Sequence, residues 1–131
     1  GRARGGRDGV CWPRLTWLDL SWCAQPSTPQ QLLQLVRRHC PALQHLALQG
    51  FKEALRPADT FNCLLLDAPP SLRFLDCSWC DEVDGELARR ASKRRPRVVV
   101  VDYYCSAWVG GRCLGDMGDP ETKEALADIQ L

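Results

Sequence analysis

Three stretches of the chain carry the same pattern of leucines and polar residues. Residues 15–23 read LTWLDLSWC, residues 43–51 read LQHLALQGF, and residues 72–80 read LRFLDCSWC. Each stretch fits L-x-x-L-x-L-x-x-C, except that Phe51 replaces the last cysteine and Cys77 replaces the last leucine. Alternation of apolar and polar positions predicts a short strand with one buried face in every copy.

A fourth, weaker copy lies in residues 97–106, where four consecutive valines leave the register open. Starting this copy at Arg97 would point Asp102 into the core, where an unpaired carboxylate costs several kcal/mol. Starting it at Val98 points Val101 inward and Asp102 outward, so we adopt the Val98 register.

Helices are expected between the strands. The residues STP at 27–29 are a helix-start signal, followed by an apolar stripe that runs to Cys40. Asp84 is a suitable N-cap for a second helix that ends near Arg94. Residues 58–67 form a candidate for a third, less regular helix.

The first leucines of the three clear copies are 28 and 29 residues apart. A period of about 20 to 29 residues is typical of leucine-rich repeats. The sequence therefore predicts an α/β fold, a leucine-rich-repeat solenoid. We expect a partial horseshoe of about four repeats, with parallel strands on the concave face and helices on the convex face.

This repeat domain is predicted to span residues 11–108. Residues 1–10 are expected to form a flexible basic arm. Residues 109–131 are expected to form a glycine-bearing linker and then a short helix that begins near Asp119.

The segment HCPALQHLALQG at residues 39–50, together with the strand ends DLSWC and DCSWC, resembles the cysteine-containing subfamily of leucine-rich repeats. That subfamily makes up the C-terminal half of F-box/LRR proteins, and the resemblance covers residues 15–106. It implies a substrate receptor: an F-box recruits a Skp-cullin ubiquitin ligase, and the repeats hold the protein to be ubiquitinated. We find no F-box pattern in these residues, so the ligase-docking part lies upstream of Gly1 or is not part of the protein.

Outward residues of successive strands should align in columns across the concave face. The predicted columns are Trp17, His45, Phe74 and Val100; Asp19, Ala47, Asp76 and Asp102; and Ser21, Gln49, Ser78 and Tyr104. Aromatic side chains beside carboxylates suit a protein or peptide that carries Lys or Arg. The alternative, which stays open at this point, is that these are ordinary solvated strand residues.

Cys77 and Cys80 have the spacing of a metal-binding or redox pair. The repeat explains both as buried core residues, and the sequence contains no second pair to complete a tetrahedral set. We therefore expect no metal and no cofactor. A capping disulfide between Cys105 and Cys113 would fit an extracellular protein, but no signal segment is visible in the sequence.

Catalytic motifs are absent from the sequence. His39 and His45 are the only histidines, and there is no phosphate loop, nucleophile elbow or HExxH motif. The chain is therefore predicted to be a binding protein rather than an enzyme.

The formal net charge is +1, and no apolar run reaches the roughly 20 residues of a membrane span. We expect a protein partner, no nucleic acid and no membrane, with a location in the cytoplasm or the nucleus. The basic cluster in residues 89–97 is interpreted as a solvated convex face. The sequence RRAS at residues 89–92, within this cluster, resembles a kinase site. The sequence DEVD at residues 81–84, just before the cluster, resembles a caspase site.

Overall fold

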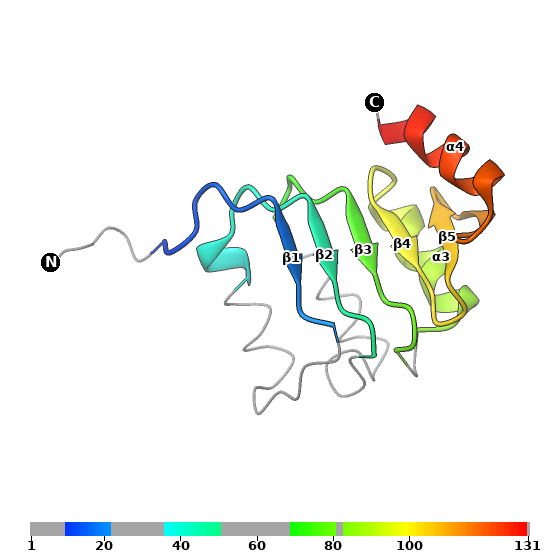
Figure 1. Cartoon of the computed structure of the whole chain (residues 1–131), viewed down its shortest axis with the longest axis horizontal. Coiled ribbons are helices and arrows are strands. Elements are labelled where there is room, and N and C mark those ends of the chain that lie inside the picture. Colours follow the sequence, from blue (N-terminus) through cyan, green and yellow to red (C-terminus); the bar gives the residue numbers. More distant parts are fainter. Residues whose placement is uncertain (1–9, 22–35, 51–68, 81–82, 131) are drawn as a thin grey trace, which may run out of the picture.

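The structure, a computed structural model, describes residues 10–21, 36–50, 69–80 and 83–130. One six-stranded sheet organises these residues, with its strands side by side in chain order (Figure 1). The elements are β1 (Trp17–Asp19), β2 (His45–Ala47), β3 (Phe74–Asp76), α3 (Gly85–Arg94), β4 (Val99–Val101), β5 (Ser106–Val109), β6 (Arg112–Asp116) and α4 (Pro120–Gln130). Residues 36–39 add a short helical stretch.

The predicted strands form the first four members of the sheet, and they pair in parallel. The same turn precedes each of them. A backbone N–H donates to the carbonyl three residues earlier at Leu15, Leu43, Leu72 and Val98, with distances of 3.3, 3.2, 3.0 and 2.9 Å. The repeated pattern therefore predicted the parallel direction of these four strands and the positions of β1, β2 and β3.

The prediction of a leucine-rich-repeat solenoid is nevertheless wrong, because the sheet is mixed. Strand β5 pairs with β4 in antiparallel orientation, and β6 pairs antiparallel with β5. The chain reverses within a few residues after β4: the amide of Cys105 donates to the carbonyl of Asp102 at 3.0 Å, and Cys105 has φ 66°. So tight a turn leaves no room for a helical return segment, and the following strand must run back beside β4.

The two described helices that follow β3 lie on opposite faces of the sheet. Val98 and Val100 belong to a cluster that includes Leu87 of α3. Val99 and Val101 belong to a second cluster that includes a residue of α4, namely Leu126. Successive residues of a strand point to opposite faces, so the sheet is covered on both sides at its β4–β6 end.

The region expected to be a glycine-bearing linker is a β-hairpin instead. Gly110 and Gly111 form its turn with φ values of 58° and 86°, and β6 follows directly. The glycines therefore mark a tight reversal, since positive φ suits glycine and few other residues. The helix predicted after this region is present as α4.

Strand β4 has a different register from the predicted one. Phe74 pairs with Val99 and Leu75 pairs with Val100, so the inward position is Val100 rather than Val101. The fourth copy begins at Val98, as expected. Its first two buried residues, Val98 and Val100, are two positions apart, whereas the corresponding leucines of the earlier copies are three positions apart. Asp102 consequently occupies the third inward position, where the earlier copies carry a leucine or a cysteine.

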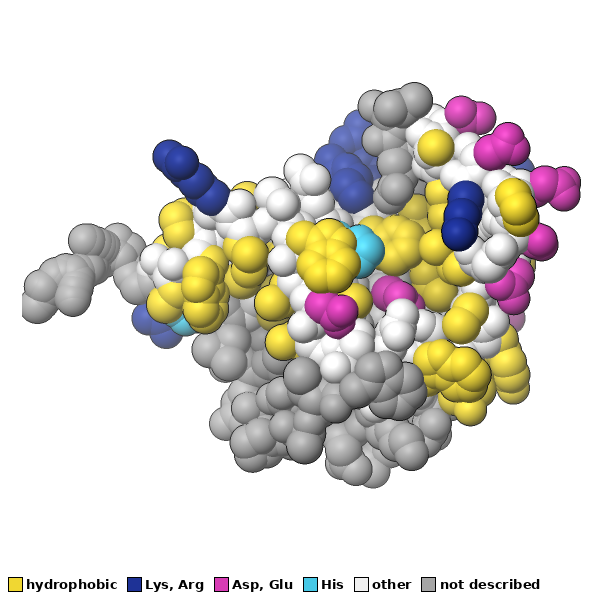
Figure 2. All heavy atoms as spheres, in the orientation of Figure 1, with side chains coloured by type: hydrophobic (Ala, Val, Ile, Leu, Met, Phe, Trp, Pro, Cys, Tyr) yellow, Lys and Arg dark blue, Asp and Glu magenta, His cyan; other side chains and the backbone are white. Residues whose placement is uncertain are grey.

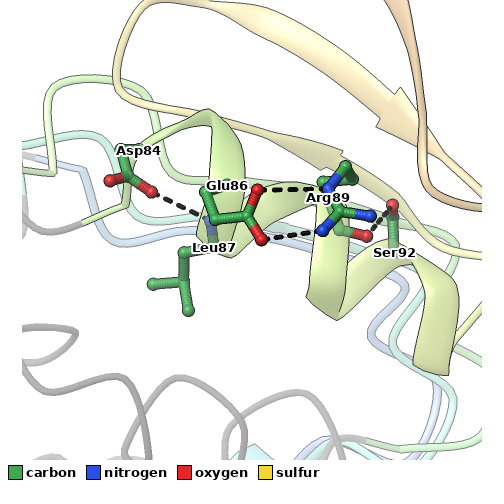
Figure 3. Close-up of polar contacts among 5 residues, drawn as sticks. All are labelled: Asp84, Glu86, Leu87, Arg89 and Ser92. Carbon is green, nitrogen blue, oxygen red and sulfur yellow. Dashed lines mark hydrogen bonds and ion pairs between the residues drawn. The ribbon is translucent and has the colours of Figure 1, made fainter.

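Helix α3 begins as the sequence predicted. Asp84 is its N-cap, and the carboxylate accepts a 2.9 Å hydrogen bond from the backbone N–H of Leu87 (Figure 3). Glu86 and Arg89 form a 2.7 Å ion pair on the exposed side of the first turn. The start of the first predicted helix and the candidate helix at residues 58–67 lie outside the described residues.

The main core lies on one face of the sheet, where the strands pack against α3 and against Val36 and Cys40. Its fully buried members include the leucines at the repeated positions of β2 and β3: Leu43, Leu46, Leu48, Leu72 and Leu75. The equivalent leucines around β1, which are Leu15, Leu18 and Leu20, are only partly buried. Burial of the repeated leucines is thus complete in the middle of the sheet and incomplete at its β1 edge.

Candidate protein-binding surface

Three aromatic rings stack across the outward face of β1, β2 and β3. The ring centroids of Trp17 and His45 are 4.7 Å apart with an interplanar angle of 19°, and those of His45 and Phe74 are 4.6 Å apart at 7°. These separations match the spacing of about 4.8 Å between neighbouring strands, because the three residues are register partners. We call these three residues the aromatic stack.

The aromatic stack is open at one end and closed at the other. The Trp17 side chain is 54% exposed, whereas Phe74 packs against the cluster of Val99 and Leu126 beneath α4. Figure 2 shows hydrophobic side chains on both sides of a histidine in the middle of this face, with carboxylates just below. Helix α4 therefore bounds the surface at the β4 side.

Two carboxylates form the next row, one on β1 and one on β3, with Ala47 of β2 between them. Asp19 is exposed, and its side chain accepts a 2.9 Å hydrogen bond from the backbone N–H of Ser21. Hydrogen bonds from the side chain and the backbone of Ser21 lower the pKa of Asp19. Asp76 accepts bonds from the amide and the hydroxyl of Ser78, at 3.0 and 2.7 Å. Both side chains are thus held in place on the outward face.

A third row of polar side chains links the two carboxylates. The side-chain amide of Gln49 donates to Asp76 at 2.7 Å, and the backbone N–H of Gln49 donates to the hydroxyl of Ser21 at 3.0 Å. Hydrogen bonds therefore run from β1 across to β3 along this row. Such a network costs little conformational entropy when a ligand binds, because its side chains are already ordered.

Three members of the predicted columns lie elsewhere. Val100 is fully buried in the core, and Val99 takes its place beside Phe74. Asp102 is 3% exposed and points into the core, and the face carries Val101 at the position expected for it. Tyr104 is 70% exposed on the loop after β4, outside the third row. The predicted outward position of Asp102 was wrong because it assumed that a buried carboxylate would be unpaired. In the structure its oxygens accept three hydrogen bonds, one of them from Trp108.

His45 is the titratable member of the aromatic stack. Burial between the two neighbouring rings lowers its pKa, and the nearby Asp76 and Asp19 oppose this shift without cancelling it. The imidazole is therefore neutral near pH 7. A pocket of about 290 Å³ opens beside it, lined by Gln44, His45, Arg73 and Phe74.

The two cysteines at the end of the third copy lie in the core. Cys77 and Cys80 are fully buried, and the thiol of Cys80 donates to the carbonyl of Leu48 at 2.9 Å. Burial raises the pKa of Cys77 well above its usual range, which keeps the thiol protonated. No disulfide joins any of the six cysteines in the described ranges, and these ranges hold no group of three potential metal ligands.

The RRAS motif lies within α3, and the described end of the DEVD motif, Val83 and Asp84, directly precedes it. Ser92 of RRAS is fully buried: its hydroxyl donates to the carbonyl of Arg89 and accepts from the amide of Gly111, both at 2.9 Å. In DEVD, Val83 is fully buried and Asp84 caps the helix. Phosphorylation of Ser92 or caspase cleavage after Asp84 would therefore require α3 to open locally.

No family model, curated protein or solved structure matches this chain. Among the described helices, none is long and apolar enough to cross a membrane.

Proposed function

We propose that this chain is a protein-binding module whose contact surface is the outward face of β1–β3. The observation that carries the proposal is the aromatic stack, which ends in a half-exposed tryptophan and lies next to the row that holds two ordered carboxylates. Aromatic side chains with low conformational freedom contribute most of the binding energy at many protein interfaces. Binding rather than catalysis is also supported by His45, which lies between two rings instead of beside a nucleophile.

The charges on this face favour a partner segment that carries Lys or Arg. Asp19 is exposed and Asp76 is half-buried, and hydrogen bonds from Ser21 lower the pKa of Asp19. Carboxylates at the side of an apolar patch select the partner and fix its register more than they add affinity. The partner would lay apolar groups on the aromatic stack and a basic group on the row below.

Replacement of Trp17 by alanine tests this proposal. A matched control exists in Trp12→Ala, because Trp12 is 55% exposed but contacts His39 away from the stack. Proteins captured by the wild-type chain should be lost with Trp17→Ala and retained with Trp12→Ala, as measured by quantitative mass spectrometry. Equal capture by both variants, each folded by circular dichroism, would refute the proposal.

A finer proposal rests on the sequence resemblance to F-box/LRR proteins. The bound protein would then be a substrate for ubiquitination, delivered through an F-box outside this chain. Purification of the full-length protein from cells should recover Skp and cullin subunits together with the bound protein. Recovery of the bound protein alone would favour a scaffold or assembly role that is unconnected with ubiquitination.

A further inference from the structure

A second group of aromatic side chains lies on the loops that follow β3 and β4. The ring centroids of Trp79 and Tyr103 are 5.7 Å apart at 66°, and those of Tyr103 and Tyr104 are 4.9 Å apart at 72°. Trp79 is 49% exposed and Tyr104 is 70% exposed. We call these three residues the loop aromatic cluster. Two of its rings thus offer large apolar faces to solvent.

The backbone of these loops adopts an unfavourable conformation. Trp79 has φ 64° and Cys105 has φ 66°, and in the described part of the chain no other non-glycine residue has positive φ. Large side chains rarely adopt this conformation, which persists only where the surrounding structure holds it. The equivalent turn of the preceding copy carries Gly50 at φ 71°, so the conformation belongs to the repeat, and at Trp79 it presents a large ring where that copy has no side chain.

Backbone hydrogen bonds hold the loops to one another. The N–H of Trp79 donates to the carbonyl of Tyr103 at 3.1 Å, and the N–H of Tyr103 donates to the carbonyl of Val83 at 2.7 Å. The carboxylate of Asp102 accepts from the N–H of Tyr104 at 2.9 Å. The exposed rings are therefore presented by an ordered frame rather than by a loose loop.

Two exposed carboxylates adjoin residues of this frame in sequence or in strand register. Asp116 is exposed and is the register partner of Ser106, next to the loop that carries Tyr104. Asp84 is also exposed and directly follows Val83, whose carbonyl binds Tyr103. Aromatic ring faces attract cations, and nearby carboxylates strengthen that attraction.

We propose that the loop aromatic cluster is a second binding site, which takes an arginine side chain of a protein partner. The planar guanidinium would stack on an exposed face of Trp79 or Tyr104, while Asp116 or Asp84 compensates its charge. Arginine fits better than lysine because it stacks on rings while it keeps its in-plane hydrogen-bond donors. This site is separate from the aromatic stack and does not depend on it.

Titration with acetyl-arginine amide tests the site, with the neutral acetyl-citrulline amide as the matched probe. Nuclear magnetic resonance follows the indole N–H of Trp79 and the ring protons of Tyr104. Arginine should shift both signals with at least about three-fold higher apparent affinity than citrulline. Equal shifts with the two probes would overturn the proposal, because charge would then play no part.

Two variants assign the binding to these rings. Trp79→Gly keeps a backbone that is compatible with φ 64° and removes the ring, so the domain should fold while the arginine-dependent shift at Tyr104 is lost. Tyr104→Leu, at a 70% exposed position, should weaken the shift of the Trp79 indole. Arginine-dependent shifts that persist in both variants would refute the site.

A third variant separates this site from the protein-binding surface. Trp17→Ala removes the exposed end of the aromatic stack and should leave the arginine titration unchanged. If Trp17→Ala loses partner capture while arginine binding at Trp79 is absent in the wild type, the proposed function stands and the second site fails. The opposite pair of results would retain the second site and reject the protein-binding face.

Discussion

The indole N–H of Trp108 donates a 2.9 Å hydrogen bond to the buried carboxylate of Asp102. The other oxygen of that carboxylate accepts from the backbone amides of Tyr104 and Ser106, at 2.9 and 3.0 Å. One side chain thus joins the end of β4, the turn after it and β5. This arrangement reverses the chain and ends the parallel part of the sheet.

Replacement of Asp102 by alanine should therefore destabilise the protein strongly. Three donors would lose a charged acceptor, two of them in the turn that aligns β5, and we expect a loss of about 3 kcal/mol in the free energy of unfolding. Urea denaturation measures this value. The control is Asp116→Ala, at an exposed carboxylate that accepts from the amide of Gly118. A cost for Asp102→Ala no larger than that of the control would contradict this role.

Loss of the helix cap at Asp84 should have a smaller effect. Asp84→Ala removes the acceptor for the amide of Leu87, and such N-cap substitutions cost about 1 kcal/mol. Asp84→Ser retains a capping oxygen and should recover most of that stability. Chemical denaturation measures the free energy of unfolding of both variants. If serine is as destabilising as alanine, the side chain of Asp84 does not act as a cap.

The stability of the fold should fall in mildly acidic solution because of His45. Its pKa is lower in the folded chain than the ordinary value of 6.5, so the unfolded chain takes up the proton first. The contribution of His45 is complete above pH 6.5 and is lost as the pH falls from there through the folded pKa. The Asp19 shift has the same sign but acts near its own ordinary value of 3.8.

The variant His45→Phe separates the pH dependence due to His45 from that due to Asp19. Phenylalanine keeps a ring between Trp17 and Phe74 but has no titratable group. Free energies of unfolding measured from pH 8 to pH 5 should decline less in His45→Phe than in the wild type. Parallel profiles over this range would show that His45 has the same pKa in both states.

Glycine at position 115 should be required for α4 to dock. Gly115 has φ 125°, and an added Cβ would lie 2.6 Å from the hydroxyl oxygen of Thr122 on α4. Gly115→Ala should cost more than about 1 kcal/mol and should speed hydrogen exchange in α4. Gly110→Ala is the matched control, because Gly110 also has positive φ but an added Cβ there meets nothing within 4 Å. Equal costs would mean that backbone strain, and not contact with α4, explains both.

The sequence by itself determined the four parallel strands, the aromatic stack and the start of α3. Each of these depends on local signals, namely leucines at fixed spacing, alternation along a strand, and an N-cap before an apolar stripe. The stack was predictable because equivalent residues of parallel strands must lie about 4.8 Å apart, whatever surrounds them.

Only the tertiary structure decided how the sheet ends, where β4 is in register and what covers each face. The register depended on whether Asp102 would find donors, and its closest partner, Trp108, lies on a strand that the repeat pattern does not include. The glycines after Trp108 could mark a linker or a hairpin turn, and the choice depended on the docking of α4 above Val99 and Val101. Such long-range contacts leave no periodic signal in the sequence, because each contact occurs once in the fold and does not recur from one copy of the repeat to the next.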